Sequence, residues 1–384
     1  MAARRRFDGA QVKPEEVRTP EDLARLPVLK KSELAELQRK ALPFGGLLGV
    51  PREELRRIYV SPGPIYDPEG REPGYFGMAK ALYAAGFRKG DLVQNCFAYH
   101  LTPGGMILDE GLSVLGCTVI PAGTGSTELQ VKVMRDLQVT GYVGTPSFLM
   151  ALAEKGEELG FDLQKDLALE VAFVSGEMML ESLRAALEEK LGILVRQGYA
   201  TADLGAVAYE CPAASGMHVS EGLLVEILDP ETADLKGPGE AGEVVITAFN
   251  KVYPLIRFGT GDLSAYTDEP CLCGRTSKRL TRILGRVGDA VKVRGMFVHP
   301  RQVEEVMARF PAVARYQVIV DRKGYQDEMI VKVELKEGTD QGRLREELEQ
   351  GVRDLLRLRA EIKFVPQGSL EGVEKRIVDL RKWK

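Results

Sequence analysis

The segment Tyr253–Tyr266, YPLIRFGTGDLSAY, and the segment Cys271–Pro300, CLCGRTSKRLTRILGRVGDAVKVRGMFVHP, decide the organisation of the chain. The second segment carries three glycines between 285 and 295, and a helical pattern begins after them with Pro300 in its first turn. Glycine-rich sequence followed by a new element is typical of a junction between folded units. We therefore predict a domain boundary near Asp289.

The length of 384 residues exceeds what one ordinary hydrophobic core supports, so two packed units are expected. We predict a body at residues 1–288 and a smaller unit at residues 289–384. Composition is 44% hydrophobic and 28% charged, as in globular proteins, and no apolar run reaches the length of a membrane span. No apolar run follows the basic N-terminal residues, which argues against a secretory signal and favours the cytoplasm.

The charge pattern argues against a nucleic-acid partner. The net charge is −4, and Lys and Arg are interspersed with Glu and Asp instead of forming a basic stripe. Five cysteines in a chain of this length do not make a disulfide framework. From charge and composition, no membrane or nucleic-acid partner is expected.

Apolar segments alternate with amphipathic helical patterns from Gly90 onward. The segments that read as strands are Leu92–Phe97, Thr118–Ile120, Gly141–Val143 and Val171–Val174. Strand and helix alternation predicts a mainly parallel sheet. Residues 222–249 then read as two strands around a Pro/Gly/Asp-rich connection, which predicts an antiparallel β unit.

Short helices are predicted near the N-terminus, where Thr19 and Ser32 stand as cap residues before acidic first turns. The last ninety or so residues read as a small α+β unit. Its predicted elements are a helix from Pro300, strands at Tyr316–Asp321 and Met329–Leu335, a charged helix at Gln341–Leu358 and a strand at Ile362–Val365.

Together with four upstream motifs, the two opening segments resemble the phenylacetate-coenzyme A ligase family, a branch of the AMP-forming acyl and aryl adenylating enzymes. The upstream motifs are PFGGLLGVPREELRRIYVS (43–61), LSVLGCTVIPAGTGSTELQ (112–130), VSGEMM (174–179) and YATADLG (199–205). The resemblance runs from about Pro20 to the C-terminus. The family's usual N-terminal segment is not found in it, which suggests a short chain or a misassigned start.

The resemblance implies an α/β adenylate-forming fold, with a large α/β N-terminal body that includes a β unit and a small α+β C-terminal lid domain. Asp289 would be the hinge of the lid. The implied reaction joins a carboxylic acid to coenzyme A with ATP, giving acyl-CoA, AMP and pyrophosphate. ATP with Mg2+, the acid and coenzyme A would be its ligands, and a homodimer is expected from the general tendency of such proteins to oligomerise.

The same resemblance assigns roles to residues of the body. Asp262 would accept the ribose hydroxyls, since one carboxylate can accept both, and Arg286 would lie beside the ribose or phosphate. The remaining assignments are Tyr199, Ala200 and Thr201 near the adenine, Ser175, Gly176 and Glu177 as the adenine loop, Asp203 as the Mg2+ ligand, and Tyr99, His100 and Gly123 in the acid pocket. Other interpretations stay open: a loop-capping Asp262, a surface ion pair for Arg286, a plain turn at 175–177 and a strand-end His100.

Two motifs depart from the family pattern. The phosphate loop should lie at Ser61–Pro68, but SPGPIYDP loses two backbone donors to proline and places Asp67 where a lysine is expected. In the lid motif, EGVEKRIVD (371–379), Val373 stands in place of the lysine that stabilises the adenylation transition state. Lys375 is the alternative catalytic lysine, and a solvated surface lysine is its simpler interpretation.

Three cysteines and a histidine suggest a zinc site. Cys271 and Cys273 form a C-x-C pair on a Pro/Gly-flanked turn, and Cys211 and His218 lie on a second short segment. The resemblance supports the set, because relatives also place Cys and His at these two positions. Three sulfurs and one imidazole suit tetrahedral Zn2+, and four protein ligands leave no open position, so the expected role is structural.

Three functions remain open at this point. The first is an AMP-forming ligase for an aryl or other small acid, favoured by the intact motif around Asp262. The second is a catalytically impaired member that binds a nucleotide or acyl-CoA without adenylation, favoured by the altered phosphate loop and by Val373. The third is a zinc-stabilised assembly subunit.

Overall fold

The computed structural model describes residues 2–61, 64–289, 291–293, 296–298, 300–323, 326–336, 338–339, 341–356, 358–373 and 375–381. Its helices are α1 (Ala2–Gly9), α2 (Pro20–Leu23), α3 (Lys31–Lys40), α4 (Met78–Ala85), α5 (Gly104–Leu115), α6 (Thr127–Asp136), α7 (Pro146–Glu158), α8 (Leu163–Asp166), α9 (Glu181–Leu191), α10 (Pro300–Ala308) and α11 (Gln341–Leu356), with 3-10 turns η1 (Pro14–Glu16), η2 (Arg52–Glu54) and η3 (Val287–Asp289). Within the described residues, no helix is long and apolar enough to cross a membrane.

One large sheet runs through the body. Its strands are β1 (Leu29–Lys30), β4 (Leu92–Asn95), β5 (Thr118–Pro121), β6 (Gly141–Gly144), β7 (Val171–Val174), β8 (Leu194–Thr201), β9 (Gly205–Glu210), β10 (Met217–Val219), β11 (Leu223–Leu228), β12 (Gly242–Ala248), β13 (Phe258–Thr267) and β14 (Arg279–Arg286). The order is β11-β12-β13-β14-β10-β9-β8-β7-β6-β4-β5, with β1 beside β13. Strands β4 to β8 pair in parallel, and β8 to β14 pair antiparallel.

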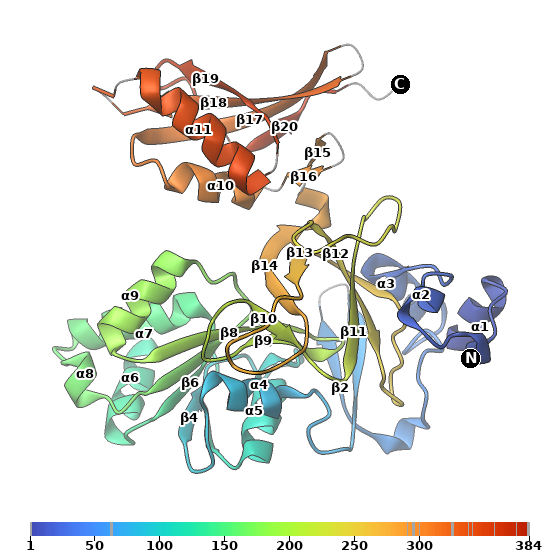
Figure 1. Ribbon diagram of the computed structural model, residues 1–384. Helices are drawn as coiled ribbons and strands as arrows, with labels where there is room; N and C mark the ends of the chain where they lie inside the picture. Colours follow the sequence, from blue (N-terminus) through green and yellow to red (C-terminus); the bar gives the residue numbers. More distant parts are fainter. Residues whose placement is uncertain are drawn as a thin grey trace.

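Helices cover both faces of the parallel half (Figure 1). The alternation of side chains along β7 shows why: Ala172 and Val174 join a core with α6, α7 and α9, whereas Val171 and Phe173 join a core with α4 and α5. A strand buried on both faces has no polar side, which accounts for its continuous apolar sequence. The four parallel strands predicted from such runs are all present.

The C-terminal unit forms its own four-stranded sheet, which stands apart from the body sheet in Figure 1. Its strands are β17 (Val313–Lys323), β18 (Gln326–Leu335), β19 (Glu361–Val365) and β20 (Ile377–Asp379), in the order β19-β18-β17-β20. Helices α10 and α11 pack on it around a separate hydrophobic core. A short ladder, β15 (Val291–Val293) with β16 (Met296–Val298), follows η3. The predicted α+β composition of this unit is confirmed, and β20 was not predicted.

A hairpin stands where a loop was expected. Strand β2 (Leu55–Ser61) pairs antiparallel with β3 (Ile65–Gly70), with Tyr59 opposite Asp67 and Ser61 opposite Ile65. Pro62 and Gly63, at the tip of the predicted phosphate loop, lie outside the described residues. The departure from the family's phosphate loop at Ser61–Pro68 therefore includes a strand at 65–68, and the apolar Ile65 of this strand is buried in a hydrophobic core with Leu55 and Phe258.

Candidate functional site

Most of the predicted body residues lie at the carboxyl ends of the parallel strands. The chain passes from β4 to β5 on one side and then to β6 on the other side of β4, so the strand order reverses at β4. Ligands of open α/β sheets bind outside the carboxyl ends of the strands at such a reversal. Tyr99 and His100 follow β4, Gly123 follows β5, and Ser175–Glu177 follow β7, so the topology brings them to one edge.

Asp262, Tyr199 and Arg286 form a polar cluster where the parallel and antiparallel halves meet. The Tyr199 hydroxyl donates to Asp262 Oδ2 at 2.7 Å, and Arg286 Nε lies 2.9 Å from Asp262 Oδ1. Asp262 and Arg286 face each other across β13 and β14. The Arg286 side chain is 62% exposed while Asp262 is 9% exposed, so the guanidinium lies between the carboxylate and solvent.

Burial sets the electrostatics of this cluster. Desolvation raises the pKa of Asp262 above its ordinary value, although the Tyr199 hydroxyl and the Arg286 charge act in the opposite direction. Burial also raises the pKa of Tyr199 well above its ordinary value, with the Asp262 charge as the second cause. The phenol is therefore a hydrogen-bond donor at neutral pH, and Asp262 is an acceptor that Tyr199 orients.

The predicted adenine loop follows β7. The Ser175 amide donates to the carbonyl of Gly144 at 3.1 Å, which ties the loop to the end of β6. Gly176 has φ +80°, a conformation that L side chains rarely adopt, so glycine is required for this turn. Glu177 is exposed, and its carboxylate accepts from the Ser147 amide at 3.4 Å. The loop is built as a tight turn at the carboxyl edge.

The residues predicted for an acid pocket differ in exposure. The Tyr99 hydroxyl donates to Asp109 Oδ2 at 3.0 Å, whereas His100 is exposed. The Gly123 carbonyl accepts from Gln130 Nε2 at 3.0 Å, and its amide donates to the Asn95 carbonyl at 3.0 Å. These bonds fix the loop after β5 against β4.

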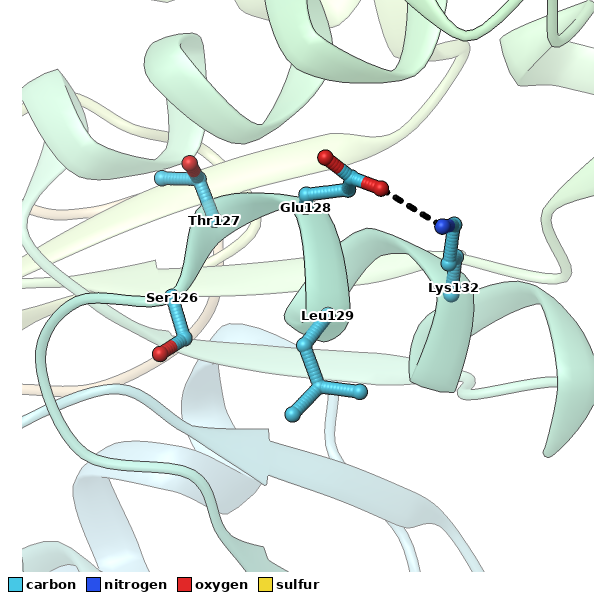
Figure 2. A pocket seen from close by; sticks show the side chains of 5 residues that line it. All are labelled: Ser126, Thr127, Glu128, Leu129 and Lys132. Atoms are coloured by element: carbon cyan, nitrogen blue, oxygen red, sulfur yellow. Dashed lines mark hydrogen bonds and ion pairs between the residues drawn. The ribbon is translucent and has the colours of Figure 1, made fainter.

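A hollow of about 520 Å³ opens at the start of α6, close in sequence to Gly123. Figure 2 shows the side chains that line it, with an ion pair between Lys132 Nζ and Glu128 Oε1 at 2.6 Å: Ser126, Thr127, Glu128, Leu129 and Lys132. None of Tyr99, His100 and Gly123 lines this hollow, and Asp262 does not line it either. This hollow is therefore separate from the predicted site residues at the carboxyl edge of the sheet.

Asp203, predicted as a Mg2+ ligand, is buried and ion-paired. Lys31 Nζ lies 2.6 Å from Asp203 Oδ2, and Asp203 Oδ1 has no hydrogen-bond partner among the described residues. Asp67 of the hairpin is adjacent: burial, followed by the charge of Asp203, raises the pKa of Asp67 to about 8. Lys31 also acts on Asp262 as a neighbouring positive charge. The sequence did not indicate that Lys31 belongs to this site.

The lid residues lie in the C-terminal unit. Lys375 is exposed, and its backbone carbonyl accepts from Gln317 Nε2 at 3.1 Å. Val373 lies two residues before it, in the connection between β19 and β20. Asp289 is the last residue of η3, at the junction between the two sheets. In this arrangement the lysine motif lies on the separate sheet domain.

The four predicted metal ligands converge. Cys211 follows β9, His218 lies in β10, and Cys271 and Cys273 lie in the connection between β13 and β14. All four ligand atoms lie within 4.8 Å of one another. The Cys211 and Cys271 sulfurs are 3.7 Å apart, and Cys273 Sγ is 3.3 Å from His218 Nε2.

The donor set fits Zn2+. Sulfurs bound at about 2.3 Å in a tetrahedron are about 3.8 Å apart, which is close to the observed separation. His218 Nδ1 lies 3.3 Å from Ser277 Oγ, an outer contact that leaves Nε2 facing the sulfurs. Burial, followed by the nearby Arg275 charge, lowers the pKa of His218, which favours the neutral imidazole that a metal requires.

Comparison with known proteins gives two family models. The model described as AMP-binding enzyme matches residues 103–250, and the model described as AMP-binding enzyme C-terminal domain matches residues 295–381. The first match includes the carboxyl ends of β4 to β8, and the second covers the C-terminal sheet.

Curated relatives match over almost the whole chain. A phenylacetate-coenzyme A ligase of Thermus thermophilus is 35% identical over 99% of this chain and 92% of its own length. Phenylacetate-coenzyme A ligases of Escherichia coli and Aromatoleum evansii are 32% and 30% identical, over 98% of this chain and 90% and 89% of their own lengths.

A solved structure of 2-hydroxyisobutyryl-CoA ligase in an open conformation, in complex with 2-HIB-AMP and CoA, aligns with a TM-score of 0.86 at 25% identity, over 98% of this chain and 86% of that chain. The same ligase in the thioesterification state aligns with a TM-score of 0.70 at 26% identity, over 99% of this chain and 85% of that chain. The arrangement of the two sheets here is therefore more similar to the open conformation.

Proposed function

The chain belongs to the phenylacetate-coenzyme A ligase family, and from that membership we propose that it is an AMP-forming acid–coenzyme A ligase. It would activate an aryl or other small carboxylic acid with ATP, release pyrophosphate, and transfer the acyl group to coenzyme A. The observation that carries the proposal is the cluster of Tyr199, Asp262 and Arg286 at the carboxyl edge of the sheet, within a chain that matches ligases over nearly its full length.

The cluster has the properties that a ribose site needs. An ionised Asp262 offers acceptor oxygens for two hydroxyls, and Tyr199 holds the carboxylate in a fixed orientation at 2.7 Å. Arg286, at the solvent side, would then be free to contact the nucleotide phosphate. Ser175, Gly176 and Glu177 would flank the adenine with Tyr199, Ala200 and Thr201, and the turn at Gly176 lets the backbone approach closely.

Individual residues are assigned further roles in the proposed ligase. Asp203 would hold Mg2+ with the nucleotide, and Tyr99, His100 and Gly123 would border the acid. Residues 289–384 would act as a lid that turns at Asp289, and Lys375 stays a candidate for the lysine that Val373 replaces. Cys211, His218, Cys271 and Cys273 would hold one structural Zn2+, and the protein would work in the cytoplasm as a homodimer.

A second function is favoured by one specific observation. Asp67 replaces the expected phosphate-binding lysine, and it is buried in a strand beside Asp203. A carboxyl at this position supplies no positive charge to a triphosphate, and it opposes the triphosphate when it is ionised. A member that binds nucleotide or acyl-CoA without adenylation would have such a residue.

Pyrophosphate exchange separates the two functions. The full-length protein, with Mg2+ and ATP, is incubated with labelled pyrophosphate and a panel of aryl and short-chain acids. The ligase proposal predicts label in ATP that depends on at least one of the acids. Absence of exchange with every acid, while AMP still binds, would favour the non-adenylating member.

A further inference from the structure

Four side-chain oxygens beside the nucleotide cluster are buried and without hydrogen-bond partners among the described residues. They are both carboxylate oxygens of Asp67, Asp203 Oδ1 and Ser61 Oγ. Asp67 is 1% exposed, Asp203 7% and Ser61 4%. Buried polar groups are almost always hydrogen-bonded, so a group of unpartnered oxygens points to a ligand that they share.

The three residues come from two separate elements that converge. Ser61 ends β2 and Asp67 lies in β3, so the hairpin supplies two of them, while Asp203 follows β8. Burial, then the Asp203 charge, the Ser61 hydroxyl and the Lys31 charge set the pKa of Asp67, so these side chains lie close together. The Lys31 ammonium contacts Asp203 Oδ2, so the opposite oxygen of Asp203 remains for another partner.

We infer that Ser61, Asp67 and Asp203 form a protein-held site for one hard divalent cation of the Mg2+ class. Carboxylate and hydroxyl oxygens are the ligands that such ions select, and sulfur and imidazole are absent from this set of three residues. Two carboxylates with one ammonium leave one negative charge for the ion to balance. Lys31 is 28% exposed, so this edge of the cluster reaches solvent.

Metal binding by these residues does not depend on the proposed ligase function. The role of the bound ion in holding nucleotide phosphates does rest on that function. In the family pattern a lysine at the position of Asp67 would meet the phosphates. Here the exchange of lysine for Asp67 would replace that fixed cation by a metal ion, which binds through one or two carboxylates and keeps positions for phosphate oxygens and water. Asp67 would thus be a binding residue instead of a defect of the loop.

Direct metal binding tests the inference without nucleotide or acid. The full-length, zinc-loaded protein is titrated with Mn2+ alone, followed by electron paramagnetic resonance of the free ion and by calorimetry, with Mg2+ as competitor. We expect about one Mn2+ per chain, displaced by Mg2+. Asp67→Asn should weaken Mn2+ binding at least tenfold, and Ser61→Ala should weaken it less, because an anionic ligand contributes more than a hydroxyl.

Asp136→Asn is the matched control, because Asp136 is exposed at the end of α6 and should leave Mn2+ binding unchanged. Asp67→Asn replaces a buried carboxyl by an amide of the same shape, and an unchanged melting temperature would show that it folds. Equal Mn2+ affinity of the parent and Asp67→Asn, or no Mn2+ binding by the parent, would overturn the inference. Mn2+ binding through Asp67 in a protein that exchanges no pyrophosphate would leave this site standing while the ligase proposal fails.

Discussion

At the scale of residues, the cysteine thiols differ in their pKa values and therefore in how easily they ionise. Burial raises the pKa of Cys96 to about 12 and that of Cys117 to about 11. Burial also raises the pKa of Cys273, but hydrogen bonds from the backbone and side chain of Arg275 outweigh it and bring the value to about 7. A thiolate is the form that binds zinc, and within the cluster burial raises the pKa of Cys211 to about 11, so Cys273 is the cluster thiol that is prepared for ionisation.

This difference in pKa predicts the outcome of thiol labelling. In zinc-loaded protein at pH 8 all five thiols should react slowly with a disulfide reagent, and removal of the metal by a chelator should release one fast thiol per chain, that of Cys273. Cys117 should stay slow, because a pKa two units above its ordinary value of 9.0 leaves about a hundredfold less thiolate. Its labelling rate should rise about tenfold per pH unit from pH 7 to about 10.

Metal analysis completes this test. We expect about one zinc per chain in protein purified without chelator and a value near zero for Cys271→Ser, since loss of one of four ligands breaks the tetrahedral set. Cys117→Ser is the control and should keep its zinc. A parent protein without zinc, or a fast Cys273 thiol before chelation, would contradict the structural metal site.

For the proposed metal ligands, the C-x-C turn was visible as residue types, but Cys211, 60 residues before Cys271, was included because the family resemblance supported it. Local sequence was insufficient for the contact between Tyr199 and Asp262, which are 63 residues apart, and for Lys31. Ser32 was predicted as the helix cap, but α3 begins at Lys31 with Lys30 as its cap residue, so that prediction was wrong. The Glu33 carboxylate accepts from the Lys30 amide at 3.2 Å, and the helix starts two residues earlier than the sequence pattern suggested.

At the scale of elements, a buried ion pair fixes α9 on the sheet. Arg184 of α9 donates two hydrogen bonds to the Glu210 carboxylate of β9, at 2.9 and 2.8 Å, and a third to the Val195 carbonyl at 2.7 Å. Both side chains are under 10% exposed. Such a pair contributes little relative to apolar residues, but removal of one partner leaves the other charge buried alone.

Arg184→Met is therefore expected to lower the free energy of unfolding by about 3–5 kcal/mol, measured by chemical denaturation of the zinc-loaded protein. The double variant Arg184→Met, Glu210→Gln should recover part of this loss, because the amide is neutral and still accepts from the Gln197 backbone. Arg135→Met, on the exposed end of α6, is the control and should change stability by less than about 0.5 kcal/mol. A double variant as unstable as the single one would argue against an uncompensated charge.

The elements differed in how well the sequence predicted them. Strand β7 was predicted because a strand buried on both faces is a continuous apolar run, and β4 to β6 were predicted from short apolar segments that alternate with helical patterns. The hairpin of β2 and β3 was not, because its prolines and glycine read as a loop and the pairing of Tyr59 with Asp67 depends on a partner strand. The structure of this segment depends on pairing between the two strands and not on local residue preferences.

At the scale of the whole molecule, the residues proposed to bind the nucleotide and the position of the family's catalytic lysine lie in different units. The cluster of Tyr199, Asp262 and Arg286 is in the body, and the position of the family's lysine, Val373, is in the C-terminal unit. The arrangement of the two units is more similar to the open conformation. An ion pair between Arg282 of β14 and Glu305 of α10 joins the two units among the residues that the structure describes. Sequence could predict the two units but not the order of twelve strands, which depends on non-local pairing.

A lysine restored at position 373 of the C-terminal unit should increase the rate of adenylation. Val373→Lys should increase acid-dependent pyrophosphate exchange by up to about a hundredfold, since a fixed donor to the transition state typically contributes 10²–10³-fold. Lys375→Ala serves as the partner variant and should leave exchange unchanged if that lysine is only a solvated side chain. Loss of exchange in Lys375→Ala, with no gain from Val373→Lys, would assign the catalytic role to Lys375.

Nucleotide binding through Asp262 is tested most simply by calorimetry of AMP binding to the parent and to Asp262→Asn. If the Asp262 carboxylate binds the ribose, AMP should bind the parent, and Asp262→Asn should weaken the affinity roughly ten- to a hundredfold, because hydrogen bonds to a charged acceptor are lost. Asp136→Asn, at an exposed site, should bind as the parent does. Equal AMP affinity in the parent and Asp262→Asn, or no AMP binding at all, would contradict ribose binding by Asp262.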